Sequence, residues 1–249
     1  MYNNDQLIGE GSTARIYMDV KDTDYVYKVS KVANGLVCRD EFNLQRDANA
    51  EVFAAPSDYI SVPRVTDMGL DDQGRCQIRM ERVIPLCASS NNAYTQVHAV
   101  LNHESRDITH EGSGDYLGRL EVLKCIENVC GARPNQKTLD FLAEKAAQLI
   151  SIVQFGSQQT AADTEMVLGF TGGDNCYKLY LLDFDKSNRW TTENDYVVKQ
   201  LAKVISDKDY YPIDDIERYD IFWDTYIKTA ESYGYENMAR KVQQEVLNL

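Results

Sequence analysis

Two neighbouring stretches of the sequence decide the fold: the glycine turn Ile8-Gly-Glu-Gly-Ser-Thr-Ala-Arg-Ile-Tyr17 and the strand pattern Tyr25-Val-Tyr-Lys-Val29. Because glycine has no Cβ, backbone N–H groups in such a turn can approach a phosphate closely. A lysine on the following strand, Lys28, can then reach the same phosphate as a point charge. An ordinary β-hairpin with a solvated lysine has the same pattern. The residues expected to form the phosphate-binding turn are Gly9, Gly11 and Ser12.

Length and composition indicate a globular protein with an acidic surface. The chain has 249 residues, of which 43% are hydrophobic, so it can form one large domain or two small lobes that share a cleft. The formal net charge of −13 disfavours binding to nucleic acids and to anionic membranes. No stretch approaches the roughly 20 apolar residues that cross a bilayer, and the polar residues 1–6 do not resemble a secretory signal. We therefore expect a cytoplasmic or nuclear protein that is not secreted.

The six cysteines are scattered, and none of them forms a C-x-x-C pair. This arrangement argues against a structural zinc site. It predicts reduced, mostly buried thiols, as is usual in a cytosolic or nuclear compartment. The cysteines are Cys38, Cys76, Cys87, Cys125, Cys130 and Cys176.

The periodicity of the apolar residues predicts an α+β protein with most of its strands in the first third. Strands are expected within 7–29 and at 61–66 and 77–83, with a helix at 39–53. The remainder is mainly helical, with helices expected at 135–153, 193–206, 215–233 and 235–247, and short buried strands at 165–168 and 178–183. We therefore divide the chain into a small β-rich N-lobe, 1–84, and a mainly helical C-lobe, 85–249.

Carboxylates at two places in the sequence, one after a predicted strand and one on a predicted helix, can contribute to a site with Lys28. Asp183 follows an apolar run at the end of a predicted buried strand, where a carboxylate can hold Mg²⁺ or cap a turn. Glu41 lies on the predicted helix, and an ion pair with Lys28 would orient the lysine and keep it charged. Asp47 and Glu51 are alternatives for that pairing, and all three acids can instead lie on a solvated helix face.

In this chain order, the glycine turn, the strand lysine, the helix and Asp183-Phe-Asp185 resemble a divergent protein-kinase-like fold. More narrowly, the chain is similar to a fungal family of uncharacterised kinase-like domains of unknown function. The resemblance covers most of the chain except about residues 86–137. The matching stretches are Ile8-Gly-Glu-Gly-Ser12, Val62-Pro63, Met80-Glu-Arg-Val83, Leu142-Ala-Glu-Lys-Ala146, Asp163-Thr-Glu-Met-Val-Leu-Gly169, Leu181-Leu-Asp-Phe-Asp185, Asp209-Tyr-Tyr-Pro212 and Phe222-Trp-Asp-Thr-Tyr226.

The resemblance implies a cleft between the two lobes that binds ATP and Mg²⁺. Lys28 would hold a phosphate while paired with Glu41, and the glycine turn would form the lid of the cleft. The segment that contains Glu81 and Val83 would join the lobes and present its backbone groups to the edge of the adenine.

The same resemblance assigns the metal ligands and the catalytic base, and here the chain departs from the kinase pattern. Asp183 and Glu165 would hold Mg²⁺, with Glu165 in place of an asparagine and Asp185 in place of a glycine. Thr160 stands where the catalytic aspartate belongs, and threonine cannot accept a proton from a substrate hydroxyl as a carboxylate can. Asp163 is the nearby acid that can replace it.

Three functions remain open at this point. The first is a degenerate kinase-like protein, a pseudokinase or scaffold that binds a nucleotide and a protein partner. The second is an active but divergent phosphotransferase that modifies a protein or a small molecule. The third is an unrelated interaction domain in which the glycine turn is coincidental. The substitutions at Thr160 and Asp185 favour the first.

Overall fold

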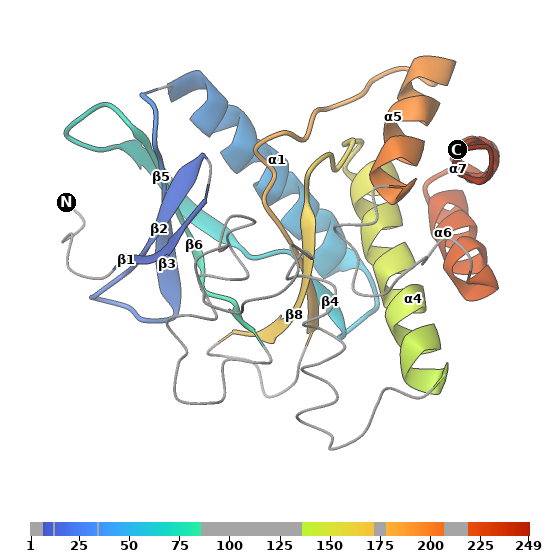
Figure 1. The fold of residues 1–249 in the computed structure, drawn as a ribbon, viewed down its shortest axis with the longest axis horizontal. Coiled ribbons are helices and arrows are strands. Elements are labelled where there is room, and N and C mark those ends of the chain that lie inside the picture. The colour runs from blue at the N-terminus through green and yellow to red at the C-terminus, as the bar shows by residue number, and fades with distance from the viewer. Residues whose placement is uncertain (1–6, 12, 34, 86–135, 172–177, 207–218) are drawn as a thin grey trace, which may run out of the picture.

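The computed structural model describes residues 7–11, 13–33, 35–85, 136–171, 178–206 and 219–249. In these ranges the protein is α+β, as predicted, with two β-sheets and a group of helices (Figure 1). None of the helices in these ranges is long and apolar enough to cross a membrane.

The first sheet is antiparallel, with the strand order β1-β2-β3-β6-β5. Its strands are β1 (Leu7–Glu10), β2 (Ala14–Met18), β3 (Tyr25–Ser30), β5 (Val65–Leu70) and β6 (Cys76–Glu81). Alternate residues of β6 are buried, because successive side chains of a strand point to opposite faces. Ile16 of β2 and Ile78 of β6 lie opposite Lys28, which places the lysine on the central strand of the sheet.

Helix α1 (Gly35–Ala54) packs into two hydrophobic cores. Its first part contributes Cys38 and Phe42 to the core beside the first sheet. Its second part contributes Leu44, Ala48 and Val52 to a larger core that also includes helix α4 (Gln136–Ser151). Figure 1 shows α1 running from the first sheet to the side of α4. A single helix therefore links the two cores.

The second sheet has the strand order β4-β9-β8-β7. Its strands are β4 (Ile60–Ser61), β7 (Ile84–Pro85), β8 (Glu165–Phe170) and β9 (Lys178–Leu182). The pairing of β4 with β9 is parallel, and the other two pairings are antiparallel. Four successive residues of β9 are buried, as expected for a strand covered on both faces, so its sequence is apolar without alternation.

The larger core is completed by α5 (Asp195–Ser206), α6 (Asp220–Ser232) and α7 (Glu236–Leu247). Helix α4 continues into a π-helical turn, η2 (Ile152–Gly156), which contains the buried Gln154. The Gln154 side chain accepts a hydrogen bond from the Tyr226 hydroxyl, and its backbone carbonyl accepts one from the Trp190 indole. These bonds fix the end of the turn, from which the chain continues to Thr160.

Most of the predicted elements are present. The helices expected at 39–53, 135–153, 193–206 and 235–247 correspond to α1, α4, α5 and α7, and the helix expected at 215–233 begins at Asp220 within the described residues. The single strand expected at 61–66 is wrong. Residues 60–61 belong to β4 of the second sheet, and β5 of the first sheet begins at Val65. Pro63 lies between them, and its missing N–H cannot continue a ladder of hydrogen bonds.

Cys38 of α1 and Cys76 of β6 form a disulfide, with 5.4 Å between their Cα atoms. The prediction of reduced thiols is therefore wrong for this pair. The two residues are 38 positions apart and follow no recognisable spacing, so no sequence pattern predicts the bond. The other four cysteines lie outside the described residues.

Candidate functional site

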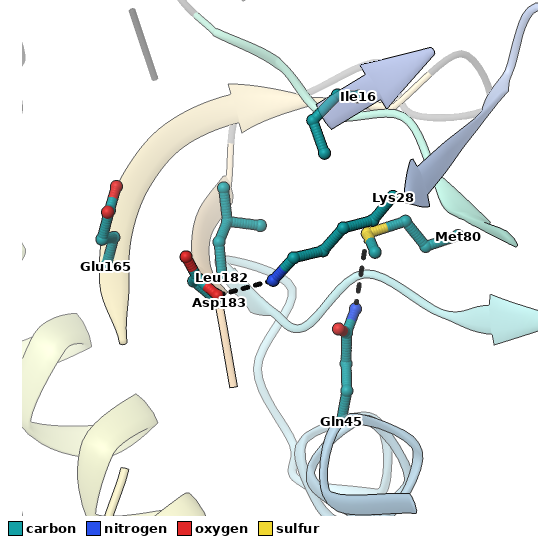
Figure 2. A pocket seen from close by; sticks show the side chains of 7 residues that line it. All are labelled: Ile16, Lys28, Gln45, Met80, Glu165, Leu182 and Asp183. Carbon is teal, nitrogen blue, oxygen red and sulfur yellow. Dashed lines mark hydrogen bonds and ion pairs between the residues drawn. The ribbon is translucent and has the colours of Figure 1, made fainter. Parts of the chain in front are cut away.

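Lys28 is held between two carboxylates that come from distant parts of the chain. Its Nζ lies 2.5 Å from Glu41 Oε1 on α1 and 2.6 Å from Asp183 Oδ1 at the end of β9. Figure 2 shows the lysine extending from β3 towards Asp183. The side chains of Lys28 and Glu41 are 11% and 8% exposed, whereas that of Asp183 is 29% exposed. The expected pairing with Glu41 is therefore present, and the open side of the cluster is the side of Asp183.

The charges in this cluster do not balance. Burial alone would lower the pKa of Lys28, but the negative charges of Asp183 and Glu41 outweigh it and hold that pKa above its ordinary value. Burial also raises the pKa of the Glu41 carboxyl, and the nearby Lys28 ammonium opposes this without cancelling it. Asp185 interacts with the same groups, so three carboxyl groups surround one ammonium. The cluster therefore has excess negative charge when every group is ionised.

Asp183 owes its position to a sharp turn at the end of β9. Its φ is +61°, in the left-handed region that aspartate tolerates better than most residues. The next residue, Phe184, is fully buried, and its carbonyl accepts a hydrogen bond from the Ser187 backbone N–H. The buried ring thus anchors the turn, while the Asp183 carboxylate is directed towards Lys28.

Asp185 is a second carboxylate on the same turn. Its Oδ2 accepts a hydrogen bond of 3.0 Å from the Thr13 hydroxyl, which lies in the β1–β2 turn. Its Oδ1 is buried and has no hydrogen-bond partner among the described residues. Burial is the main cause that raises the pKa of this carboxyl, followed by the charge of Asp183. A buried oxygen of this kind is suited to a ligand that brings positive charge.

Two adjoining pockets meet at Lys28. The smaller, about 40 Å³, is the one shown in Figure 2 and also contains Asp183 and Glu165. The larger, about 380 Å³, lies between the first sheet, α1 and the turn after β9. It is lined by Thr13, Ala14, Lys28, Ser30, Lys31, Val32, Cys38, Glu41, Cys76, Ile78, Asp185 and Lys186.

The glycine turn closes on itself at one of the predicted positions. The Gly11 N–H donates to the Ala14 carbonyl at 2.8 Å, and Gly9 pairs with Ile16 across β1 and β2. The Gly11 N–H is therefore engaged within the turn. The third residue assigned to this turn, Ser12, lies outside the described residues.

The segment expected to contact an adenine is held by neighbouring backbone. The Glu81 N–H donates to the Arg64 carbonyl at 2.9 Å, and its carboxylate accepts from the Arg64 N–H. The Arg82 N–H donates to the carbonyl of Asp24. Val83 is buried against Val167, Tyr180 and Leu182 of the second sheet. The segment thus connects β6 of the first sheet to β7 of the second, and its contact with a nucleotide stays a prediction.

Glu165, the other predicted metal ligand, begins β8 and lies opposite Leu182 in the sheet. It lines the smaller pocket with Asp183, on the far side of Asp183 from Lys28 in Figure 2. Among the described residues, no group of three histidine, cysteine, aspartate or glutamate side chains is arranged to hold a metal ion by itself. A cation at this site would therefore need ligands from a bound molecule as well.

The segment expected to carry the catalytic base is held in an irregular conformation. Gln158, Ala161 and Asp163 all have positive φ angles. The side chain of Thr160 is directed into the protein, where its hydroxyl accepts the Asn188 N–H at 3.0 Å. Asp163 forms an ion pair with Lys186, which also lines the larger pocket. Thr160 is therefore engaged in holding the turn after β9, and Asp163 lies beside that turn.

The sequence interpretation missed three residues of the site. The sequence patterns predict no role for Thr13 or Lys186, and they mark Asp185 only as a departure from a glycine. Asp185 had a signal in the sequence, because its spacing from Asp183 places two carboxylates on one turn. The role of Lys186 had none, since its partner Asp163 is 23 residues away.

A scan against protein-family models and a search of the curated proteins gave no match to this chain.

Proposed function

We propose that this chain is a degenerate protein-kinase-like protein, a pseudokinase or scaffold whose two lobes enclose a cleft for ATP and Mg²⁺. The observation that carries the proposal is the position of Lys28 between Glu41 and Asp183. In this arrangement the buried Glu41 fixes the lysine, whose positive charge can bind a phosphate. The more exposed Asp183 supplies a carboxylate that can bind a metal ion. Under this proposal, residues 1–84 and 85–249 supply opposite walls of the cleft, and the protein acts in the cytoplasm or nucleus.

The residues present fit a magnesium ion bound together with a nucleotide. Mg²⁺ is usually held by one or two carboxylates and by substrate phosphates, so a complete cage of protein ligands is not needed. Asp183 is the carboxylate on the open side of the cluster, and Asp185 has a buried oxygen without a partner among the described residues. Glu165, on the same pocket wall as Asp183, is the third acid in reach. When bound, the metal would neutralise phosphate charge.

The conformation of Thr160 favours a degenerate protein over an efficient enzyme. Its hydroxyl is buried and already accepts a hydrogen bond, so it can neither take a proton from a substrate nor turn freely towards one. A binding function does not depend on this residue, because the lysine and the acids around it are intact.

A second candidate function is an active, divergent phosphotransferase, and the ion pair of Asp163 with Lys186 favours it. This pair places a carboxylate and an ammonium beside the turn that carries Asp183 and Asp185. A phosphoryl transfer relies mainly on positioning and charge, so Asp163 can serve as the base with Lys186 balancing its charge.

A calorimetric titration of the folded protein with ATP, with and without Mg²⁺, tests the proposal. We expect saturable binding that needs the metal, and a loss of about 1.5–3 kcal/mol of binding free energy in Lys28→Met, because a charge-assisted phosphate contact is removed. The matched control is Lys199→Ala, which removes an exposed lysine of α5. Circular dichroism of each variant shows that it is folded before titration. No binding to the folded wild type would overturn the nucleotide cleft. Equal binding by the wild type and Lys28→Met would place the nucleotide site away from Lys28.

A further inference from the structure

The Cys38–Cys76 disulfide lies in the wall of the same pocket as the Lys28–Glu41 pair. Both cysteines are 4% exposed, but they line the larger pocket, whose volume of about 380 Å³ admits small molecules. The disulfide is thus neither a surface feature nor sealed inside the core. Nothing in the proposed binding of ATP uses its sulfur atoms.

The disulfide and the ion pair join the same two structural elements. Glu41 follows Cys38 by three residues on α1, so the two side chains lie on one face of the helix. Ile78 follows Cys76 by two residues on β6 and is the residue opposite Lys28 in the sheet. The disulfide therefore fixes the distance between the helix that carries Glu41 and the sheet that carries Lys28.

The two halves of α1 are held in different ways. The part of α1 that precedes Leu44 is held, in its described residues, by the disulfide, by the Glu41–Lys28 pair and by the apolar packing of Phe42. The part from Leu44 onward makes polar contacts with several other segments. These contacts are those of Leu44 with Gln159, Gln45 with Pro63, Asp47 with Arg189 and Asn49 with Val62. Loss of the disulfide would therefore loosen the half that contains Glu41 and leave the other half fixed.

We propose that Cys38 and Cys76 form a reversible redox site that sets the position of Glu41 against Lys28 and thereby controls nucleotide binding. The last step rests on the proposed function, whereas the control of α1 does not. The oxidised form holds α1 against the sheet and pairs Glu41 with Lys28. The reduced form releases the first half of α1, so Lys28 loses the partner that orients it.

The reductant is a dithiol. One thiolate of the dithiol attacks Sγ of Cys38 or Cys76, the S–S bond breaks, and a mixed disulfide forms with the attacked sulfur. The second thiol of the reductant then closes on the first and releases the protein. Two electrons pass to the protein, two protons end on the thiols of Cys38 and Cys76, and the reductant leaves as an intramolecular disulfide. Oxidation by a disulfide of the same class reverses each step.

The test compares the full chain after treatment with oxidised or reduced dithiothreitol, with peptide mapping to assign the redox state of each cysteine. Hydrogen exchange followed by mass spectrometry is measured in both forms, and ATP–Mg²⁺ affinity is measured in both by calorimetry. We expect faster exchange in the reduced form at residues 38–44 but not at 45–54. We also expect ATP to bind the reduced form at least about fivefold more weakly.

Two variants make the comparison specific. C38S/C76S should behave as the reduced protein under both treatments. C125S/C130S retains Cys38 and Cys76 and should respond as the wild type does.

Each result decides between the parts of the proposal. Failure of Cys38 and Cys76 to couple under oxidising conditions overturns the redox site. Equal exchange at 38–44 in the two forms overturns it as well, whether or not ATP binds. A difference in exchange with no ATP binding in either form upholds the redox site and overturns the proposed function. A difference in exchange with equal ATP affinity overturns the control of binding.

Discussion

Lys28 Nζ lies 2.6 Å from Asp183 Oδ1, although 155 residues separate the two in the sequence. The contact joins the central strand of the first sheet to the end of β9 in the second. Because Glu41 contacts the same ammonium from α1, three elements meet at one nitrogen atom. The site is therefore a candidate for ligand binding, and it also holds three elements of the fold together. Its variants must be tested for stability as well as for binding.

The two members of the Lys28–Glu41 ion pair should differ in their effect on stability. Lys28→Met leaves Glu41 buried without its cation, and breaking a buried pair in this way costs about 3–5 kcal/mol, less any relief that Glu41 gains by taking up a proton. Glu41→Gln should cost less, because Lys28 keeps Asp183 as a partner. Urea unfolding at pH 7 of both single variants and the double variant measures these costs and the coupling between the two residues. Equal costs for the two single variants would contradict the assigned asymmetry.

Asp185→Asn should weaken the dependence of ATP binding on Mg²⁺. The amide keeps an oxygen that can accept the Thr13 hydroxyl, but it removes the negative charge that would attract a cation. Calorimetry with ATP at a series of Mg²⁺ concentrations checks this, with Glu193→Gln, an exposed acid in the segment that precedes α5, as the control. An unchanged Mg²⁺ dependence in Asp185→Asn would remove this residue from the metal site.

Phosphoryl transfer from ATP should be weak or absent in the wild type, because Thr160 is buried and cannot act as a base. Any residual activity should fall sharply in Asp163→Asn, whereas Thr160→Asp should not raise it, because the side chain at position 160 is directed into the protein. Turnover of radiolabelled ATP by the purified proteins is the measurement, and Asp183→Asn controls for contaminating kinases. Robust turnover that needs Asp183 would show that the protein is an enzyme, and indifference to Asp163 would show that another group is the base.

Asp19 should contribute to unfolding in acid. Burial would raise the pKa of this carboxyl, but hydrogen bonds from Arg79 and from the Lys21 N–H hold that pKa below its ordinary value. The stabilisation from Asp19 is then complete above the ordinary aspartate pKa of about 3.9, and it is lost as the pH falls through the lower value of the folded state. Urea unfolding between pH 2 and pH 6, roughly the range in which aspartate titrates, should show a shallower loss of stability in Asp19→Asn. The exposed Asp72→Asn is the control.

Gly169→Ala should destabilise the second sheet. A Cβ at this position would lie 2.8 Å from the Ile84 carbonyl oxygen and 2.8 Å from Val83 Cγ1, and the backbone oxygen cannot move without disturbing the pairing of β7 with β8. Overpacking of this kind costs about 1–3 kcal/mol. Gly69→Ala in β5 is the matched control, because nothing lies within 4 Å of its added Cβ. In thermal unfolding, the melting temperature of Gly169→Ala should be clearly lower than that of Gly69→Ala.

Much of the fold and the centre of the site could be predicted from local patterns. Alternation in the strands and three- to four-residue periodicity in the helices gave the elements, and the chain order of Lys28, Glu41 and Asp183 indicated their meeting. The remainder depends on long-range contacts without a local signature. The disulfide joins residues with no characteristic spacing, the pairing of Asp163 with Lys186 depends on two separate turns, and β4 is too short for periodicity to reveal it.

The sharing of α1 between two cores has a consequence for dividing the molecule into pieces. A fragment that ends at residue 84 would keep α1 but lose α4. Leu44, Ala48 and Val52 would then form an apolar stripe exposed to water. The same cut would strip β4 of its neighbour β9. The boundary between residues 84 and 85, which the sequence pattern favours, is thus unsuitable for producing either half of the protein alone. We expect the two halves to aggregate when they are expressed separately. They should regain the circular dichroism spectrum of the native protein only when they are refolded as a mixture.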